Sequence, residues 1–424
     1  MIKPGFSLLC RLALPLVFGV SLAMGISWDN LQLESFFGQA AATELRGTPS
    51  AYWGDDPAPT ILAERADLPP LRAVIYNLHS GLGPDWRLFA PRADVEANLR
   101  AVARHLAEAA PAESPVDVVG LNEVDFHSRR SGWIDQAEFL ADELRTLTGS
   151  RYQVVRGETW RRDVPGLEVR FGNALLVRHP VVDLHACTLG GSCEEESRAV
   201  LNPAGGLLSR RLGEKRGVVR VRIDFHNHPV DVLVTHLEAF VLKQREGQAA
   251  EILRSYMRPD ISTVLLGDTN AVPSAMTAAR HPFAADRTHD ILTSGKLIDA
   301  RIDLAARSGA DDLSPWATYP AGAPQWPLDG IFATADMSPQ TVQVVGGEES
   351  DHRGLLVNYG WLGDQSAKEH GLWHDTMRRR QLEQILARDF RTMEPGITRR
   401  ADWLATATGY GEMAVELLRG SNAL

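Results

Sequence analysis

The chain has 424 residues, of which 44% are hydrophobic and 23% are charged, and its formal net charge is −10. An apolar share of this size is enough for a sizeable core and excludes wholesale disorder. The negative charge argues against a protein that binds nucleic acid by bulk electrostatics, because such proteins carry a basic footprint. It leaves open an enzyme that acts on phosphates through a bound cation, which acidic side chains would hold.

The N-terminal segment, residues 1–30, has the pattern of an export signal. Lys3 and Arg11 precede an uncharged apolar run over residues 12–26, and Ala23-Met24-Gly25 is a small-x-small cleavage sequence. A basic start and a run of this length are typical of a secretory signal, whereas a membrane-spanning helix usually takes about 20 apolar residues. We expect export to a periplasmic, secreted or outward-facing membrane-anchored location. Cleavage of the segment and its retention as an anchor both stay open.

Two of the three cysteines, Cys187 and Cys193, flank the short sequence TLGGS, and the third, Cys10, lies in the export segment. In an oxidising compartment the first two are expected to close a small disulfide. The alternative is a pair of unpaired loop thiols, which export disfavours.

The first elements of the body alternate strand, helix and strand. Residues 31–69 have no sustained period and are predicted to be a linker or arm. A strand is predicted over Leu71–Leu78, ended by Gly81 and Gly83. Pro91 then opens a predicted helix, whose apolar residues at helical spacing are Leu99, Val102, Leu106 and Ala109. The segment DVVGLNEVD follows as a strand that ends in acidic residues.

The rest of the body is predicted to be mostly strands, with one helix over 244–256. The predicted strands are RYQVVRG, FGNALLVRHPVVDL, GVVRVRIDFH, PVDVLVTHLEA, ISTVLLGDTN, LDGIFAT and RGLLVNYGW. Many strands with few helices indicate an α/β sandwich, in which helices cover two stacked sheets. Residues 362–424 are predicted to form a C-terminal helical extension, with helices over 367–391 and 403–418.

Several predicted strands begin or end in polar residues that a plain core strand does not need. These residues are Asn77, Glu123, His236, Asp268, Asn270, Asp329, Asp351 and His352. Taken singly, each is more often a turn, cap or satisfied structural residue than a catalytic one. Ligand sites in layered α/β folds are commonly built from strand-end residues. The whole series together therefore predicts a site.

The ordered motifs YN, NEVD, GNALL, THLEA, GDTN, LDGIF and SDH make the chain resemble the endonuclease/exonuclease/phosphatase superfamily over residues 71–361. The resemblance implies a four-layered α/β sandwich with two mainly antiparallel mixed sheets flanked by helices. It implies a catalytic domain over residues 70–361. It also implies hydrolysis of phosphate esters with Mg²⁺, and leaves Mn²⁺ or Ca²⁺ open in its place.

The resemblance assigns a role to each polar residue. The implied metal ligands are Glu123, Asn77 and Asp351. The implied catalytic residues are Asp268 as general base, Asn270 at the phosphate oxygens, His236 and His352 as donors to the phosphoryl group, and Asp329 as the partner of His352. A divalent cation held by carboxylates would neutralise the charge that accumulates around phosphorus. Arg170 and Asn173 are expected to contact the substrate phosphate, with a strand-entry turn as the alternative.

Two motifs depart from the common pattern. Thr269 stands where an apolar residue is common, and its side chain is expected to point away from the site. Gly330 stands where an aromatic residue or His is frequent, which is expected to open the pocket or alter its floor. His79 is read either as a residue of the pocket rim or as a surface residue, and His226–Pro229 as a hairpin turn and not a zinc site.

The predicted function is an exported, metal-dependent phosphoesterase, foremost a phosphodiesterase, that acts by water attack. Its partner is a phosphate-ester substrate, and no protein partner is predicted. Nucleic acid is left open because the basic piece Ser209–Arg222 could hold a backbone. The alternative is a partly exposed strand with alternating residues, which we favour for its second half. A lipid substrate is left open because Trp316, Tyr319 and Trp326 could enter a membrane, although their loop could equally be a core-packing segment that leads into Asp329. Membrane contact through the N-terminal segment is left open too. The alternative from another class is a non-catalytic binding module that keeps the superfamily fold.

Overall fold

A computed structural model describes residues 67–392, apart from residues 86, 112, 165, 190–214, 259, 274–285, 295 and 311, and describes only the backbone from residue 381 onward. The predicted export segment, most of the predicted linker, Cys193 and the predicted helix over 403–418 lie outside these residues. The chain divides into two compact units, the first ending at Arg378 and the second beginning at Arg379. Within the described ranges, no helix is both long and apolar enough to cross a membrane.

The first sheet has six strands in the order β11-β12-β1-β2-β4-β3. Only β1 and β2 are parallel neighbours, and the other pairs are antiparallel. The strands are β1 (Leu71–Asn77), β2 (Val118–Asp125), β3 (Gln153–Val164), β4 (Leu167–Val177), β11 (Met337–Val345) and β12 (Gly354–Trp361).

The second sheet also has six strands, in the order β5-β6-β7-β8-β10-β9. Here β7 and β8 are the parallel neighbours, and the other pairs are antiparallel. The strands are β5 (Val181–Thr188), β6 (Gly217–Phe225), β7 (His228–His236), β8 (Ser262–Asp268), β9 (Ile298–Asp299) and β10 (Asp329–Ala333).

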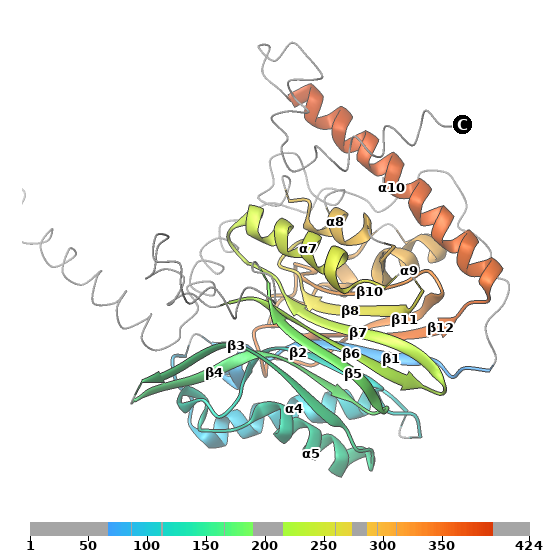
Figure 1. Ribbon diagram of the computed structural model, residues 1–424. Helices are drawn as coiled ribbons and strands as arrows, with labels where there is room; N and C mark the ends of the chain where they lie inside the picture. Colours follow the sequence, from blue (N-terminus) through green and yellow to red (C-terminus); the bar gives the residue numbers. More distant parts are fainter. Residues whose placement is uncertain are drawn as a thin grey trace, which may run out of the picture. The chain divides into compact units, whose positions relative to one another are not determined.

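Helices cover the outer face of each sheet (Figure 1). The apolar faces of α4 (Arg92–Glu108) and α5 (Gln136–Thr148) pack on the first sheet. The second sheet is covered by α7 (Leu242–Tyr256) and α8 (Thr288–Ser294), and α9 (Ala300–Ser308) lies against β10 and β11. The order helix, sheet, sheet, helix confirms the predicted four-layered α/β sandwich. After β12 the chain continues as α10 (Asp364–Thr392).

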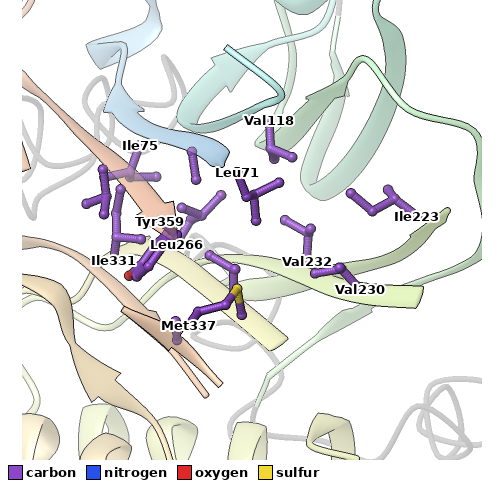
Figure 2. Close-up of a cluster of buried hydrophobic side chains, with 14 of the residues drawn as sticks. Leu71, Ile75, Val118, Ile223, Val230, Val232, Leu266, Ile331, Met337 and Tyr359 are labelled. Carbon is purple, nitrogen blue, oxygen red and sulfur yellow. The ribbon is translucent and has the colours of Figure 1, made fainter. Parts of the chain in front are cut away.

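The central core lies between the two sheets. Leu71 and Ile75 of β1 belong to this core, whereas Val74 and Tyr76 pack toward the helices of the first sheet. Side chains of a strand alternate between its faces, so both faces of β1 are buried. Such a strand is written as a continuous apolar run, which is why it could be predicted. Figure 2 shows residues of the first sheet, such as Val118, packed with residues of the second sheet.

The strand directions bring polar ends together. Asn77 pairs with Asn122 across the parallel β1 and β2, and His236 pairs with Asp268 across the parallel β7 and β8. β10 is antiparallel to β8, so its first residue, Asp329, pairs with the last residue of β8. Each sheet therefore carries its polar strand ends at one edge.

Three strand predictions need comment. The segment FGNALLVRHPVVDL was predicted as one strand but forms β4 and β5, which belong to different sheets. The edge strand β11 was not predicted. The hairpin turn between β6 and β7 is confirmed, since His226 and Asn227 have positive φ angles of 53° and 65°, as a tight two-residue turn requires.

Candidate active site

The site begins with the last residue of β1, Asn77, which is buried. Its Nδ2 donates to Glu123 Oε1 at 3.2 Å and to Asp268 Oδ2 at 3.1 Å. Its Oδ1 accepts a hydrogen bond from the backbone N of His79 at 3.0 Å, which fixes the orientation of the amide. One side chain thus links a carboxylate of the first sheet to a carboxylate of the second.

Glu123 lies in an irregular part of β2. Its φ is 54°, and the pairing of β2 with β4 shifts register between Leu121 and Val124. Such a bulge re-aims side chains at the end of a strand. The Glu123 side chain is almost completely buried, and burial raises the pKa of its carboxyl group. The nearby carboxylate of Asp351 raises the pKa further, whereas His79 opposes the rise.

Asp268 lies between two histidines. Its Oδ2 is 3.6 Å from His236 Nε2 and 3.6 Å from His352 Nε2. Its Oδ1 accepts from the backbone N of Asn270 at 3.0 Å. Burial raises the pKa of Asp268 to about 6. The charge of His352 opposes this rise, and the charge of Asp329 adds to it.

His352 is held by an ion pair behind it. Its Nδ1 donates to Asp329 Oδ2 at 2.8 Å, and the same oxygen accepts from Thr318 Oγ1 at 2.6 Å. Burial alone would lower the pKa of His352, but the carboxylates of Asp329 and Asp268 outweigh it and raise the pKa to about 10. The ring is therefore a cation at neutral pH, with its Nε2–H on the side of Asp268.

His236 has the opposite character, because its neighbour is Arg216. The guanidinium Nη1 lies 3.0 Å from His236 Nδ1. A guanidinium can only donate, so Nδ1 accepts from Arg216, while the amide nitrogen of Asn270 lies 3.1 Å from Nε2. Burial, with Arg216 and His352, holds the pKa of His236 well below its usual value. Arg216 was not singled out in the sequence, although it lies within the basic piece Ser209–Arg222.

Asp351 and His79 complete one side of the site. Asp351 Oδ1 lies 3.7 Å from His79 Nδ1, and Ser350 Oγ donates to it at 3.3 Å. His79 is buried, with 6% of its surface exposed, so the interpretation of His79 as a surface residue is wrong.

The two predicted substrate-binding residues lie in different places. Asn173 is buried behind the site, where its Nδ2 donates to the backbone O of Gly217 at 3.0 Å. The Arg170 guanidinium is exposed and lies 3.9 Å from Asp163 on β3. Asn270 is close to the histidines, with its Nδ2 3.1 Å from His236 Nε2 and donating to the Leu237 carbonyl at 3.0 Å. The roles predicted for all three stay predictions.

Sequence reasoning also missed Asn122, which ties the sheets together beneath the site. It is fully buried. Its Oδ1 accepts from the backbone N of Asp268 at 2.8 Å, and its Nδ2 donates to Asn173 Oδ1 at 2.9 Å. These bonds fix β8 of the second sheet against β2 and β4 of the first. The NEVD motif contains Asn122, but only the meeting of the sheets gives it this function.

The two unusual motif residues do not open the site. The Thr269 hydroxyl donates to the Leu328 carbonyl at 2.9 Å, so its side chain points toward the backbone that precedes β10. A Cβ on Gly330 would lie 2.6 Å from the ring of Phe332. The expectation of a wider pocket at Gly330 is therefore wrong, because the Phe332 ring fills the space.

The donor set suits a hard divalent cation beside Glu123. Glu123 and Asp351 are neighbouring carboxylates whose mutual repulsion a cation would relieve, and Mg²⁺ usually takes one or two carboxylates and several waters. Asn77 presents its amide nitrogen to Glu123, so in this conformation it orients the ligand. A second grouping, Asp268, Asp329 and His352, also has ligand atoms within 4.8 Å of one another. There the 2.8 Å hydrogen bond between His352 and Asp329 already pairs the charges, so we favour the Glu123 position.

The fold and the site together define an α/β-sandwich protein with carboxylates and histidines at the edge of both sheets. The sequence model of the Endonuclease/Exonuclease/phosphatase family matches residues 74–352, and the chain belongs to this family. No curated protein matches the chain.

Solved structures with a similar fold include an endonuclease/exonuclease/phosphatase from Beutenbergia cavernae DSM 12333. It is 22% identical, with 70% of this chain and 72% of that chain covered and a TM-score of 0.46. The human Nocturnin catalytic domain with bound sulfate is 18% identical, with 70% and 96% covered and a TM-score of 0.46. A mannosyl-6-phosphatase from Bacteroides thetaiotaomicron VPI-5482 is 14% identical, with 68% and 99% covered and a TM-score of 0.46.

Proposed function

We propose that this chain is a divalent-metal-dependent phosphoesterase that cleaves phosphodiesters by attack of water. The observation that carries the proposal is the placement of Asp268 Oδ2, which lies 3.6 Å from Nε2 of both His236 and His352. A carboxylate and two imidazoles thus meet in one small region, and Glu123 is linked to the same carboxylate through Asn77. Base, donors and a candidate cation ligand in one place are what the hydrolysis of a phosphate ester needs.

In the proposed reaction, Asp268 accepts the proton of the attacking water as the oxygen bonds to phosphorus. A general base works best when its pKa is close to the working pH. Burial brings the pKa of Asp268 to about 6, so at neutral pH the group is ionised but more basic than an ordinary aspartate. Its backbone N and its Oδ1 are both hydrogen-bonded, which holds the carboxylate in place.

The two histidines act on the phosphoryl group in different charge states, one as a cation and one as a neutral ring. His352 is a cation backed by Asp329, and it donates its Nε2 proton to the leaving oxygen as the P–O bond breaks. His236 stays neutral because burial and Arg216 lower its pKa, and its proposed role is a hydrogen bond from Nε2 to a non-bridging oxygen. Both donors are buried, where hydrogen bonds to developing charge are strongest.

Glu123 and Asp351 would hold the cation, and Asn77 would orient Glu123. A bound Mg²⁺ or Mn²⁺ would supply charge neutralisation at the phosphoryl oxygens. Activity should therefore vanish when a chelator removes the metal and return when Mg²⁺ is added back. The assay is hydrolysis of bis-p-nitrophenyl phosphate before and after EDTA treatment. Wild-type protein that is inert on every diester with each of Mg²⁺, Mn²⁺ and Ca²⁺ would instead support the non-catalytic binding module.

The substrate class is the finer part of the proposal. Trp326 and Tyr319 are buried, and the Tyr319 ring packs 4.8 Å from the ring of His352. Trp316 is partly buried, and its indole N–H donates to the Val342 carbonyl at 3.0 Å. These contacts support the core-packing interpretation of this loop over entry into a membrane. A panel of duplex DNA, RNA, sphingomyelin, phosphatidylinositol phosphates and simple diesters would identify the substrate.

We further propose that the protein is exported by its N-terminal segment, through which membrane contact stays open. Cys187 at the end of β5 is disulfide-bonded, and disulfides persist in oxidising compartments. Its predicted partner, Cys193, lies outside the described residues. Fractionation of cells with intact export should place the protein outside the cytoplasm, and intact mass will show whether residues 1–25 are removed. Recovery of the full-length chain in the cytosol with free thiols would contradict this proposal.

A further inference from the structure

A second group of metal-ligating side chains lies away from the candidate active site. It consists of Asp303 on α9 and of His370 and His374, which are one turn apart on α10. Asp303 Oδ1 lies 3.2 Å from His370 Nε2 and 3.1 Å from His374 Nε2. All three residues belong to the first compact unit. The phosphoesterase chemistry proposed above uses none of them.

His370 carries the observation that an ordinary packing role leaves unexplained. The side chain is fully buried, and its Nδ1 lies 2.8 Å from the Ala335 carbonyl, which can only accept. Nδ1 therefore carries a proton. Nε2 is buried and has no hydrogen-bond partner within the part of the chain that the structure describes, although it faces Asp303 Oδ1 at 3.2 Å. In the neutral ring, Nε2 presents a lone pair to a carboxylate oxygen, and this contact needs a cation between the two atoms.

A proton on His370 is the simpler occupant of this contact, and the experiment below separates it from a metal ion. Asp303 is already paired with Arg307, whose Nε and Nη2 lie 3.2 and 3.3 Å from its two oxygens. His374 Nε2 also lies within hydrogen-bond distance of Asp303 Oδ1. Unlike a proton, a metal ion would bind His370, His374 and Oδ1 together.

The spacing of the three atoms fits direct coordination. Zinc binds imidazole nitrogen and carboxylate oxygen at about 2.0–2.2 Å, so ligand atoms of a tetrahedral site lie about 3.3–3.5 Å apart. The two separations from Asp303 Oδ1, 3.1 and 3.2 Å, are close to this spacing, and the two Nε2 atoms lie within 4.8 Å of each other. The contact of His370 Nδ1 with the Ala335 carbonyl would fix the ring for coordination, and Arg307 would retain Oδ2. The His374 side chain is 15% exposed, which gives a fourth ligand, water, access to the site.

We propose that Asp303, His370 and His374 form a zinc site that fastens α10 to α9. The site would also affect the sandwich, because α9 carries the fully buried Arg301 as well. Arg301 Nη1 donates to the Pro327 and Asp329 carbonyls at 2.8 and 2.7 Å. A metal ion at this position stabilises the helix that supports the start of β10. The proposal is independent of whether the chain hydrolyses phosphate esters.

The test measures zinc content and thermal stability on the full-length protein. Because the candidate active site can also bind divalent metal, the reference protein carries Glu123→Gln. After chelation and incubation with micromolar Zn²⁺, this protein should retain one zinc by elemental analysis. Its melting midpoint should rise by about 5 °C when zinc exceeds the dissociation constant 100-fold. Absence of bound zinc together with an unchanged midpoint overturns the proposal, without the need for a variant in the cluster.

Two further variants separate metal binding from simple ion pairing. His374→Gln in the same background should lose the zinc and the shift. His374→Glu replaces an imidazole by a carboxylate of similar reach, so it should keep the zinc. Without zinc it should melt below the reference protein, because two carboxylates then face each other. His127→Gln is the matched control, since the His127 side chain is 60% exposed. Loss of zinc in the His127 control, or equal zinc content in reference and His374→Gln proteins, would contradict the assignment.

Discussion

The pair of Asp329 and His352 offers the sharpest test of how the site carries charge. Replacing Asp329 by Asn keeps an oxygen that can accept from His352 Nδ1 at the observed 2.8 Å, and removes the negative charge. A hydrogen bond to a charged partner contributes about 1.5–3 kcal/mol, against about 1 kcal/mol for a neutral one. Loss of preorganised charge at the reacting group typically costs about 10²–10³-fold in kcat. We expect a fall of this size in Asp329→Asn.

The same change should move a pH limit. His352 has its pKa raised to about 10, with burial opposing and the carboxylates of Asp329 and Asp268 prevailing. Without the charge of Asp329, less opposes the effect of burial, so the pKa of His352 falls. The alkaline limb of the kcat/KM profile then moves to lower pH. A histidine whose pKa is higher in the folded than in the unfolded state stabilises the fold. The stabilisation is complete at pH values below the unfolded pKa, about 6.5, and is lost as the pH rises through the folded pKa. Asp329→Asn should therefore lower the free energy of unfolding at neutral pH.

The assay is the pH dependence of bis-p-nitrophenyl phosphate hydrolysis, with urea unfolding at neutral pH and at pH 10. Asp163→Asn is a matched control, because Asp163 is exposed on β3 and should change neither profile nor stability. If Asp329→Asn keeps kcat within about threefold and keeps its alkaline limb, then Asp329 does not set the charge of His352. The catalytic reading of the pair would then be wrong.

Three more predictions concern the supports of the site. Asn122→Ala leaves the buried N–H of Asp268 and the oxygen of Asn173 without their hydrogen bonds. The free energy of unfolding, measured by urea titration, should therefore fall by about 2–4 kcal/mol. A loss below about 0.5 kcal/mol would show that the sheets do not depend on these bonds. Arg216→Ala removes the donor to His236 Nδ1, so the pKa of His236 should rise, as seen by NMR titration of the ring, and kcat should fall about 10–100-fold. An unshifted titration would show that Arg216 does not set the charge of His236. Gly267→Ala would place a Cβ 2.5 Å from the Thr235 carbonyl oxygen. β8 should then separate from β7, and the free energy of unfolding should fall by about 1–3 kcal/mol. A melting midpoint equal to that of wild type would contradict this packing.

Much of the sandwich could be predicted because its central strands are buried on both faces. β1 and β8 are written as short apolar runs that end in polar residues, and such runs are readable without knowledge of their neighbours. β11 was missed because it is an edge strand of the first sheet with a mixed burial pattern and a proline at position 339. Its sequence, MSPQTVQVV, carries no sustained apolar signal.

Contacts between distant segments account for the other failures. The run that became β4 and β5 is mostly apolar on both sides of Arg178, His179 and Pro180, and these three residues do not show that the chain changes sheets there. Arg216 precedes β6, and its approach to His236 depends on the pairing of β6 with β7. The strand-end carboxylates and histidines could be proposed as a set, but their distances could come only from the folded chain.

The sequence analysis also missed the pair of histidines in the C-terminal helix. His370 and His374 stand at i, i+4 spacing, which places both on one face of a helix. The spacing was present in the sequence EHGLWHD. Its third member, Asp303, is far away in the chain, so the set became visible only when α9 and α10 were seen side by side.

The central claim is that Glu123 holds the cation on which hydrolysis by this site depends. The most direct measurement is the rate of bis-p-nitrophenyl phosphate hydrolysis as a function of Mg²⁺ concentration, for wild type and for Glu123→Gln with a fold verified by circular dichroism. The account predicts saturable activation of the wild type, and in the variant a kcat lower by about 10²-fold or more with a weaker dependence on Mg²⁺. A variant that hydrolyses the diester at the wild-type rate with the same Mg²⁺ requirement would contradict it.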